Sequence, residues 1–422
     1  MFSRRLKQLY FALEFLNAFA TAYYFYYLFF FLRDHFGFGN AQNLGVCAVH
    51  GLVYTFAARL GGRFAQRAGY LNALPLGFGV MGAVLVAASL APAAGAAGWI
   101  AQTLGVAVWT FGMSFTWPAL EALACEQEPP DRLPRMIGIY NVTWAAGSAL
   151  AYFFGGALMD HLGGRSLFWF PAALHGLQLV VVLAVRAKAE AQSVKAMPIL
   201  RSSRREEAPF PICNLQSAIC NRSEPPHVGC SSSERSSVVT KSFQRLAWLA
   251  NPFAFVAINA LVPVIPVLAE QLALTKTLAG FFCSVWFFAR LGTFFLLWHW
   301  TGWHYRFAWM LGAFLLLIAS FATILLVLNP AVIVTAQVAF GFAVGLIYYS
   351  SLFYSMDVSE TKGEHGGIHE AAIGSGVFGG AALGAVGQVV VGSQAGSTWL
   401  VSAALVAGLA GLCVVRRKSR GT

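Results

Sequence analysis

Twelve stretches of apolar residues run through this chain of 422 residues. Each is long enough to cross a lipid bilayer as an α-helix, which needs roughly 20 apolar residues. Hydrophobic residues make up 58% of the sequence and charged residues only 11%, which is more apolar surface than a soluble protein can cover. We therefore predict an all-α polytopic membrane protein, because helices satisfy their own backbone hydrogen bonds in lipid. The expected transmembrane helices cover residues 8–32, 43–62, 71–91, 97–125, 136–158, 167–186, 246–269, 279–300, 307–328, 332–355, 367–392 and 398–415.

The positive charges indicate which side of the membrane each connection occupies. All of the 28 Lys and Arg residues except Arg33, Arg165 and Lys276 lie at the chain ends, in even-to-odd connections, or in helix ends facing that side. Cytoplasmic connections carry this excess, so both chain ends are expected in the cytoplasm. The net charge of +11 therefore reflects topology, and we expect no nucleic-acid partner. The expected location is the bacterial inner (plasma) membrane, with the first helix retained because no small-residue cleavage site follows it.

The apolar pattern is interrupted over residues 187–245, which are rich in serine, arginine and proline. We expect a flexible cytoplasmic linker there, between N-terminal (1–186) and C-terminal (246–422) bundles of six helices each. The bundles resemble each other, since Ala58-Arg59-Leu60-Gly61 matches Ala289-Arg290-Leu291-Gly292 at an offset of 231 residues. Two parallel repeats of this kind favour alternating access around a central site.

The connection after the expected helix 43–62 carries the most specific local pattern. Gly62-Arg63-Phe64-Ala65-Gln66-Arg67-Ala68-Gly69 resembles the Gly-x-x-x-Asp-Arg-x-Gly signature of the major facilitator superfamily, with Gln66 at the acidic position. Gly147 and Gly155-Gly156 have the spacing of the family's antiporter motif, with Ala151-Tyr152 in place of its Gly-Pro. The resemblance covers nearly the whole chain and implies the family's fold, twelve transmembrane helices in two parallel six-helix repeats. It also implies a conformational role for the motif positions Gly62, Gln66, Arg67 and Gly69.

Polar side chains recur at helical spacing along three expected helices, and such stripes in apolar helices are expected to face the interior of the bundle. The stripes are Glu14, Asn17, Thr21 and Tyr24; Thr110, Ser114, Trp117 and Glu121; and Asn141, Trp144, Ser148 and Tyr152. The family resemblance places the helices 8–32, 97–125, 246–269 and 332–355 around a central cavity. Aromatic and amide side chains can stack on and hydrogen-bond a small polar solute. The expected solute-binding residues are Asn17, Trp117, Asn141, Trp144, Asn259, Arg290, Tyr348 and Tyr349.

Arg290 is the strongest candidate for a functional residue, because it lies near the middle of the expected helix 279–300. An arginine at a helix centre costs about 2.5–3.5 kcal/mol on membrane-insertion scales, which indicates a function or a strong pairing. In one interpretation it binds an anionic solute or is released when a proton breaks a salt bridge. In the other it reaches the interface or pairs with an acid and only locks helices together. Its expected acid partners are Glu14, Glu121 and Glu370.

Acidic and histidine side chains in the expected helices are candidates for proton coupling. A carboxyl group buried in a membrane favours its neutral form, so it can take up and release a proton as its exposure to water changes. We expect this role for Glu14, Glu121, His369 and Glu370. Glu14 could instead be an interfacial acid, and Glu121 a hydrated residue at the cytoplasmic rim. His365 and His369 could also bind a metal, but the HExxH order is absent and we expect no metal site.

The leading hypothesis is a secondary active transporter, and no enzyme, that moves a small organic solute by alternating access and uses the proton gradient. No GxxxxGK[ST] loop is present, so we expect no ATP and no other cofactor. A membrane-embedded lipid-modifying enzyme and a non-transporting sensor on a transporter scaffold are the alternatives. The expected partners are a small-molecule solute, protons and membrane lipids, and the expected state is a monomer. The sequence leaves the chemical class of the solute undecided. Arg290 favours an anion, while the Trp, Tyr and Asn side chains would also suit a sugar or nucleoside-like molecule.

Overall fold

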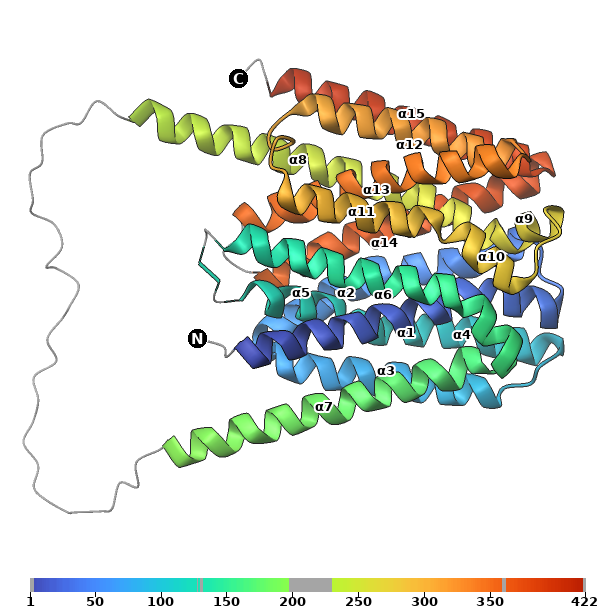
Figure 1. Ribbon diagram of the computed structural model, residues 1–422, viewed down its shortest axis with the longest axis horizontal. Helices are drawn as coiled ribbons and strands as arrows, with labels where there is room; N and C mark the ends of the chain where they lie inside the picture. The colour runs from blue at the N-terminus through green and yellow to red at the C-terminus, as the bar shows by residue number, and fades with distance from the viewer. Residues whose placement is uncertain (1–3, 127, 130–131, 197–229, 359–361, 420–422) are drawn as a thin grey trace, which may run out of the picture.

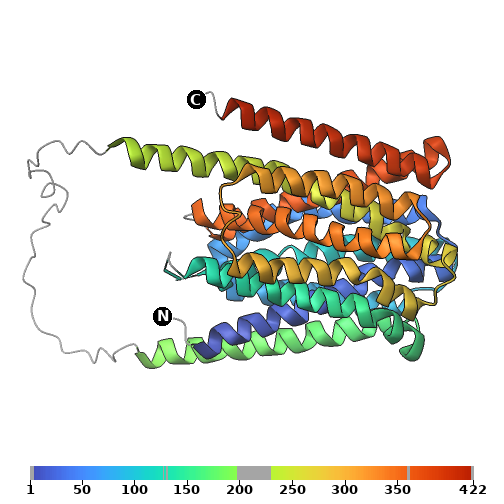
Figure 2. The same ribbon diagram turned by 45° about the horizontal axis from the view of Figure 1, so that its top comes forward.

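The computed structural model describes all residues except 1–3, 127, 130–131, 197–229, 359–361 and 420–422. Its helices form one bundle in which the long axes run roughly along one direction (Figure 1, Figure 2). Helix α1 begins and α15 ends at the same end of this bundle, where α7 also ends and α8 begins (Figure 1). We call this end the proximal end and the opposite one the distal end.

The helices follow the expected spans closely. In the N-terminal half they are α1 (Arg4–Phe36), α2 (Asn40–Ala68), α3 (Tyr70–Leu90), α4 (Gly95–Met113), α5 (Trp117–Cys125), α6 (Leu133–Leu162) and α7 (Ser166–Ala196). In the C-terminal half they are α8 (Cys230–Leu261), the 3-10 turn η1 (Val262–Val264), α9 (Ile265–Gln271), α10 (Lys276–Cys283), α11 (Val285–His299), α12 (Phe307–Leu326), α13 (Pro330–Val358), α14 (Lys362–Val391) and α15 (Gln394–Lys418).

The number of membrane crossings agrees with the prediction once interrupted helices are considered. Within the described part of the chain, eleven helical segments are long and apolar enough to span a membrane. The remaining expected span, 97–125, is divided into α4 and α5 by a turn at 114–116, just before Pro118. A proline has no backbone N–H and its ring strains the preceding helical turn, so it fits best at the start of a helix such as α5. Pro263 and Pro266 interrupt the seventh crossing in the same way, at η1 and the start of α9. Pro75, Pro171 and Pro252 nevertheless lie inside the continuous helices α3, α7 and α8.

The two halves meet along two pairs of helices. Helix α2 packs against α14, and α6 packs against α10 and α11. The sequence repeat aligns α2 with α11 and α6 with α14, so exchanging the halves turns one contact into the other. This pseudo-symmetric arrangement is what two parallel repeats produce, and it leaves the other helices free to line the interior or to face lipid.

Glycines allow close packing between several helices. A Cβ atom on Gly376 or Gly380 of α14 would collide with backbone carbonyl oxygens of α8. A Cβ atom on Gly147 of α6 would lie 2.6 Å from the carbonyl oxygen of Phe15 on α1. Small residues at this spacing bring helix backbones together in lipid.

The ends of the expected linker 187–245 are helical. Helix α7 continues to Ala196 and α8 already begins at Cys230, while 197–229 lies outside the described residues. The division into two bundles joined by a linker stays a prediction. Its described edges are extensions of the sixth and seventh crossings at the proximal end.

Candidate solute-binding cavity and acid group

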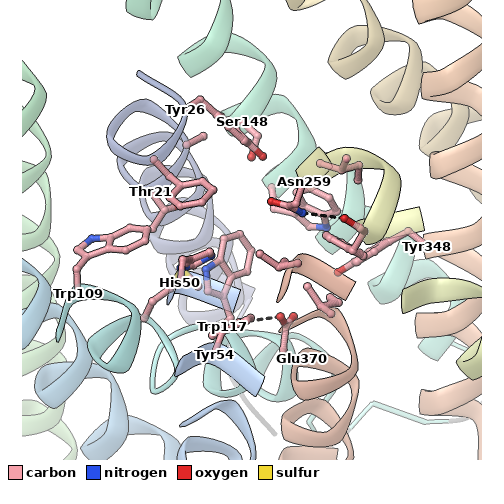
Figure 3. Close-up of a pocket in the computed structure, with 18 of the residues that line it drawn as sticks. Thr21, Tyr26, His50, Tyr54, Trp109, Trp117, Ser148, Asn259, Tyr348 and Glu370 are labelled. Atoms are coloured by element: carbon pink, nitrogen blue, oxygen red, sulfur yellow. Dashed lines mark hydrogen bonds between the residues drawn. The ribbon is translucent and has the colours of Figure 1, made fainter. Parts of the chain in front are cut away.

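A cavity of about 130 Å³ lies inside the bundle, between the two halves. Its size suits a small solute, since pockets for drug-sized ligands are several times larger. Figure 3 shows the labelled side chains converging on it from several helices. The lining residues come from α1, α2, α4, α5, α6, α8, α11, α13 and α14. The first, fourth, seventh and tenth crossings therefore surround the cavity as the resemblance implied, and the interface helices α2, α6, α11 and α14 complete the wall.

Arg290 lines this cavity and is 3% exposed. Three aromatic rings, which we call the aromatic box, surround its guanidinium group. The guanidinium carbon lies 4.6 Å from the ring centroid of Trp144 and 5.0 Å from those of Trp286 and Phe287. Contacts of this kind are worth about 0.5–2 kcal/mol each, so the box offsets part of the cost of burying the charge.

The acids expected to pair with Arg290 do not contact its guanidinium group among the described residues. Within the part of the chain that the structure describes, Arg290 forms no ion pair with Glu14, Glu121, Glu370 or any other acid, and its Nε atom has no hydrogen-bond partner. The prediction of an acid partner was wrong, because Trp144, Trp286 and Phe287 occupy the positions around the guanidinium group. Arg290 is thus a cavity-facing cation whose charge, among the described residues, is contacted by aromatic faces and by no acid.

Other expected solute-binding residues divide between the wall and the layer behind it. Trp117, Trp144, Asn259 and Tyr348 line the cavity. Asn141 lies behind Trp144 and accepts a hydrogen bond of 3.0 Å from its indole Nε1.

Two candidates lie away from the cavity wall. Tyr349 packs between the rings of Phe294 and Trp303. Asn17 is fully buried in α1, and both polar atoms of its side chain lack a partner among the described residues. Contact between these residues and a solute stays a prediction.

The second charged feature is an acid group formed by Glu121 of α5 with His369 and Glu370 of α14. One ligand atom from each of these three side chains lies within 4.8 Å of the other two. All three side chains are buried, and Glu121 is 0% exposed, so the alternative of a hydrated rim residue does not hold. Both carboxyl oxygens of Glu121 lack a hydrogen-bond partner among the described residues. Two carboxyl groups this close in a non-aqueous site cannot both carry a negative charge at low cost.

Hydrogen bonds orient the members of the acid group. The Tyr54 hydroxyl of α2 donates to Glu370 Oε2 at 2.7 Å, as drawn in Figure 3. His369 Nδ1 lies 3.3 Å from the Ser351 hydroxyl, and its Nε2 atom is buried without a partner in the described structure. Carboxylates and imidazoles also bind metals, but no further feature among the described residues marks a metal site. His365 is not part of the group.

Glu14 is also buried, at 1% exposure, and both of its carboxyl oxygens lack a partner among the described residues. It interacts electrostatically with Glu370 but does not line the cavity. The alternative of an interfacial acid does not hold, because the Glu14 side chain is buried. Lys7 pairs with Glu128 at 3.2 Å. Glu14 thus lies apart from the acid group and within its electrostatic influence.

The structure adds cavity residues that the sequence analysis missed. The polar ones are Tyr26, His50 and Tyr54, and the others include Phe25, Trp109 and Met113. His50 and Tyr54 lie one turn apart on α2, so the polar-stripe argument used for other helices would have found them. Thr21 and Ser148, which belonged to the predicted stripes, also line the wall.

Ion pairs join the halves at the distal end. Lys276 Nζ lies 2.7 Å from Asp34 Oδ2, and Arg33 pairs with Glu270. Asp160 of α6 also accepts a hydrogen bond of 2.7 Å from the Thr277 hydroxyl. These contacts link α1 and α6 to α9 and α10, over the distal side of the cavity.

The signature segment, Gly62 to Gly69, lies at the proximal end. It was expected to be a connection after the helix 43–62, but α2 continues to Ala68, so the segment forms the last turns of α2 and the turn into α3. Gly69 has a positive φ of 94° between α2 and α3, a conformation that glycine adopts readily. Gln66 accepts a hydrogen bond of 2.9 Å from Tyr70, and Arg67 is exposed. Gly62 belongs to the buried face of α2 that packs against α14.

Arg63 of this segment forms an ion pair between the halves. Arg63 Nε lies 3.2 Å from Glu364 Oε1 of α14. The segment and this ion pair therefore connect the two halves on the proximal side of the acid group.

Comparisons with known proteins agree with this architecture. The sequence profile of the Major Facilitator Superfamily matches residues 103–381. The crystal structure of the human organic anion transporter MFSD10 (TETRAN) is similar, with a TM-score of 0.66 and 14% identity over 97% of this chain and 99% of that one. The crystal structure of a mutant of the nucleoside transporter NupG is similar with a TM-score of 0.64 and 13% identity, again over 97% and 99% of the two chains. A search of curated protein sequences gave no match. At these identities the structural likeness shows the fold alone.

Proposed function

We propose that this chain, which belongs to the major facilitator superfamily and is a transporter, moves a small organic solute by alternating access and couples that movement to protons. The cavity between the halves holds the solute. The acid group holds the proton. Both lie at the contact between the halves, so a change in their packing alters the two sites together.

The observation that supports proton coupling is the composition of the acid group. Glu121 comes from the N-terminal half, and His369 and Glu370 come from the C-terminal half. When the halves are in contact here, the two carboxyl groups repel each other unless one of them carries a proton. When the halves separate on this side, water reaches the carboxyl groups and the proton can leave. The protonation state and the conformation are therefore linked.

The two ends of the bundle suit a rocking motion. Exposed ion pairs hold the distal end, and the Arg63–Glu364 pair and the acid group hold the proximal end. Exposed pairs contribute only about 0–1 kcal/mol each, so they can break and re-form during transport. In the proposed orientation the proximal end faces the cytoplasm of a bacterium, as the distribution of Lys and Arg predicts. The protein acts as a monomer surrounded by inner-membrane lipids.

The test is proton-driven uptake in proteoliposomes. Thermal-shift screening of sugars, organic acids, nucleosides and cationic drugs first identifies a binder, because a ligand stabilises the state that it binds. A pH gradient should then drive uptake of that compound against its concentration gradient, and a pH-sensitive dye should report proton movement with it. Uptake that ignores the gradient would contradict proton coupling, and binding without any flux would favour a sensor.

The Glu370→Gln variant makes the test specific. Its side chain keeps the shape of the protonated acid and cannot release a proton, so uphill uptake should be lost while exchange of labelled for unlabelled solute continues. Glu128→Gln is the matched control, because Glu128 pairs with Lys7 and does not line the cavity. Normal uphill uptake by Glu370→Gln would remove Glu370 from the mechanism.

A further inference from the structure

The chemistry of the cavity wall narrows the class of solute. Arg290 is a permanent cation in this wall, and no acid among the described residues neutralises it. A guanidinium group cannot lose its proton in a protein and offers five N–H donors in a planar fork. Aromatic faces attract the charge but accept none of these hydrogen bonds. The missing partner is therefore a group that brings both negative charge and acceptor atoms, which points to an anionic ligand.

Two hydroxyl groups add donors to the same part of the wall. Tyr26 of α1 and Tyr348 of α13 line the cavity beside the aromatic box. The ring centroid of Tyr26 lies 5.1 Å from that of Phe287, and the centroid of Tyr348 lies 5.0 Å from that of Trp144. Neither hydroxyl has a hydrogen-bond partner among the described residues. With Arg290 they bring three helices from both halves to one anion-binding position. A carboxylate matches this arrangement, since its two oxygens can accept a bidentate pair from arginine and further bonds from hydroxyls.

Another part of the wall presents an acceptor. The Thr110 hydroxyl lies 2.6 Å from the Val106 carbonyl oxygen, which can only accept, so this hydroxyl donates there. His50 Nδ1 lies 2.7 Å from the same hydroxyl oxygen and must therefore donate its own proton to it. The neutral ring then carries a lone pair on Nε2. Nε2 has no partner among the described residues, and His50 lines the cavity, so this lone pair is available to a donor on the solute.

The remaining residues of the cavity wall indicate the shape and the charge of the solute. Rings of Phe25, Trp109, Trp117 and Trp144 line the space between these polar positions and favour a flat, apolar body. Glu370 also lines the cavity, so a second negative charge on the solute meets a carboxyl group. The volume of about 130 Å³ limits the solute to a small molecule.

We infer that the cavity binds a small, flat monocarboxylate whose carboxylate is held by Arg290, Tyr26 and Tyr348, and that His50 accepts a hydrogen bond from a hydroxyl group at the other end of the solute. The inference rests on the proposed transport function for its biological role. The binding itself is measurable without transport.

Benzoate and three relatives are the probes. Dissociation constants are measured at neutral pH by isothermal titration with the purified full-length protein in detergent. Benzoate should bind. Benzamide, which has the same shape without the charge, should bind at least about tenfold more weakly than benzoate. The dianion terephthalate should also bind at least about tenfold more weakly than benzoate. Benzamide binding as tightly as benzoate, or neutral sugars and nucleosides binding more tightly than either, would overturn the inference.

Variants assign the contacts. Arg290→Gln should lose benzoate binding, and Tyr348→Phe, which keeps the ring and removes only the hydroxyl, should weaken it by about three- to tenfold. Tyr348→Phe keeps the test decisive if Arg290→Gln fails to fold, which gel filtration would reveal. If benzoate binding is unchanged in Tyr348→Phe and in folded Arg290→Gln, the assignment of the anion position is wrong.

The His50 part has its own comparison. 4-Hydroxybenzoate should bind the wild-type protein about three- to tenfold more tightly than benzoate, and this advantage should disappear in His50→Phe. An advantage that persists in His50→Phe would contradict the acceptor role.

Failure of this inference and failure of the proposed function are distinguishable. Proton-driven flux of a neutral solute would uphold the transporter and overturn the anion site. Benzoate binding with the predicted dependence on Arg290 would uphold the anion site even if no proton moved.

Discussion

Arg290 and Glu370 line the same cavity and belong to the same half of the molecule, but their surroundings differ in kind. Arg290 lies in the aromatic box of Trp144, Trp286 and Phe287 and has no acid beside it in the described structure. Glu370 lies among groups that exchange protons or donate hydrogen bonds, namely Tyr54, Glu121 and His369. Both are buried ionisable groups in the interior of a membrane protein, and neither neutralises the other.

The difference follows from what each group can do with its charge. A carboxyl group can become neutral by taking up a proton, whereas an arginine cannot become neutral by losing one. The acid group can therefore exist in the closed structure by holding protons, and Arg290 can be fully compensated only by a ligand. One region responds to protons and the other to the solute, and the contact between the halves joins them.

The largest expected effect comes from removing the charge of Arg290, which the aromatic box surrounds. Arg290→Ala should abolish transport while the protein is still produced and inserted. Truncating one partner of a buried charged pair costs about 2–5 kcal/mol, which corresponds to a loss of roughly thirtyfold to several thousandfold. The measurement is initial uptake in proteoliposomes, normalised to the amount of inserted protein.

Arg59→Ala is the matched control for this variant. Arg59 occupies the equivalent position in the sequence repeat but is exposed on α2. It should transport at nearly the wild-type rate. Equal losses in both variants would mean that an arginine at this repeat position is needed for helix packing. Normal uptake by Arg290→Ala would show that the charge inside the aromatic box is not needed for transport.

Much of the fold could be predicted because the membrane imposes one requirement on every crossing. A run of apolar residues such as 307–328 must become a helix, and the structure has α12 at Phe307–Leu326. The breaks were harder to predict, since Pro118 and Pro263 sit in apolar runs that look continuous. A proline alone does not mark a break, since Pro75, Pro171 and Pro252 lie inside continuous helices and α10 and α11 are separated at Ser284 without one. Whether a helix is interrupted also depends on the neighbouring helices.

Many residues of the site could be predicted from the sequence, but not which of them contact each other. Polar stripes identified Trp144 and Glu121, and the presence of an acid in an expected helix identified Glu370, because a polar residue inside a membrane is costly wherever it lies. Which of them meet depends on the rotation of each helix and on contacts between halves. The sequence therefore suggested an acid beside Arg290, where the structure places aromatic rings. His50 was missed because helix 43–62 was considered only for its terminal motif.

A smaller effect is expected from Glu14, which tests whether the proton-responsive region extends beyond the acid group. Glu14→Gln should slow uphill uptake by about tenfold, or about 1.4 kcal/mol, and leave solute exchange nearly unchanged. The reason is that Glu14 interacts electrostatically with Glu370 and Glu121 and has no basic partner described beside it. If both rates stay at wild-type values, proton coupling is confined to Glu121, His369 and Glu370. If exchange falls as much as uphill uptake, Glu14 serves packing.

Removing a single hydrogen bond should have a more modest effect. Tyr54→Phe deletes the bond to Glu370 and keeps the ring, so a cost of about 1 kcal/mol, or roughly fivefold, is expected in proton-driven uptake. Solute binding should change less than uptake, because Tyr54 contacts the acid group and not Arg290. Tyr349→Phe is the control, since Tyr349 lies away from the cavity. A larger effect on solute affinity than on proton-driven uptake would place Tyr54 with the solute-responsive region.

The smallest effect is expected at the distal end, whose ion pairs are exposed. Lys276→Ala removes the pair with Asp34, in which the side chains are 32% and 39% exposed. Such a pair contributes about 0–1 kcal/mol, so the opening of the distal side should increase by at most about fivefold. Labelling of Ser148→Cys in the cavity by a charged maleimide added from the distal side reports this opening. The increase should vanish at about 1 M salt, which screens the wild-type pair as well, and Lys188→Ala, at an exposed position near the proximal end of α7, should show none. An increase that persists at high salt would mean that Lys276 holds the halves through its position in α10 and not through its charge.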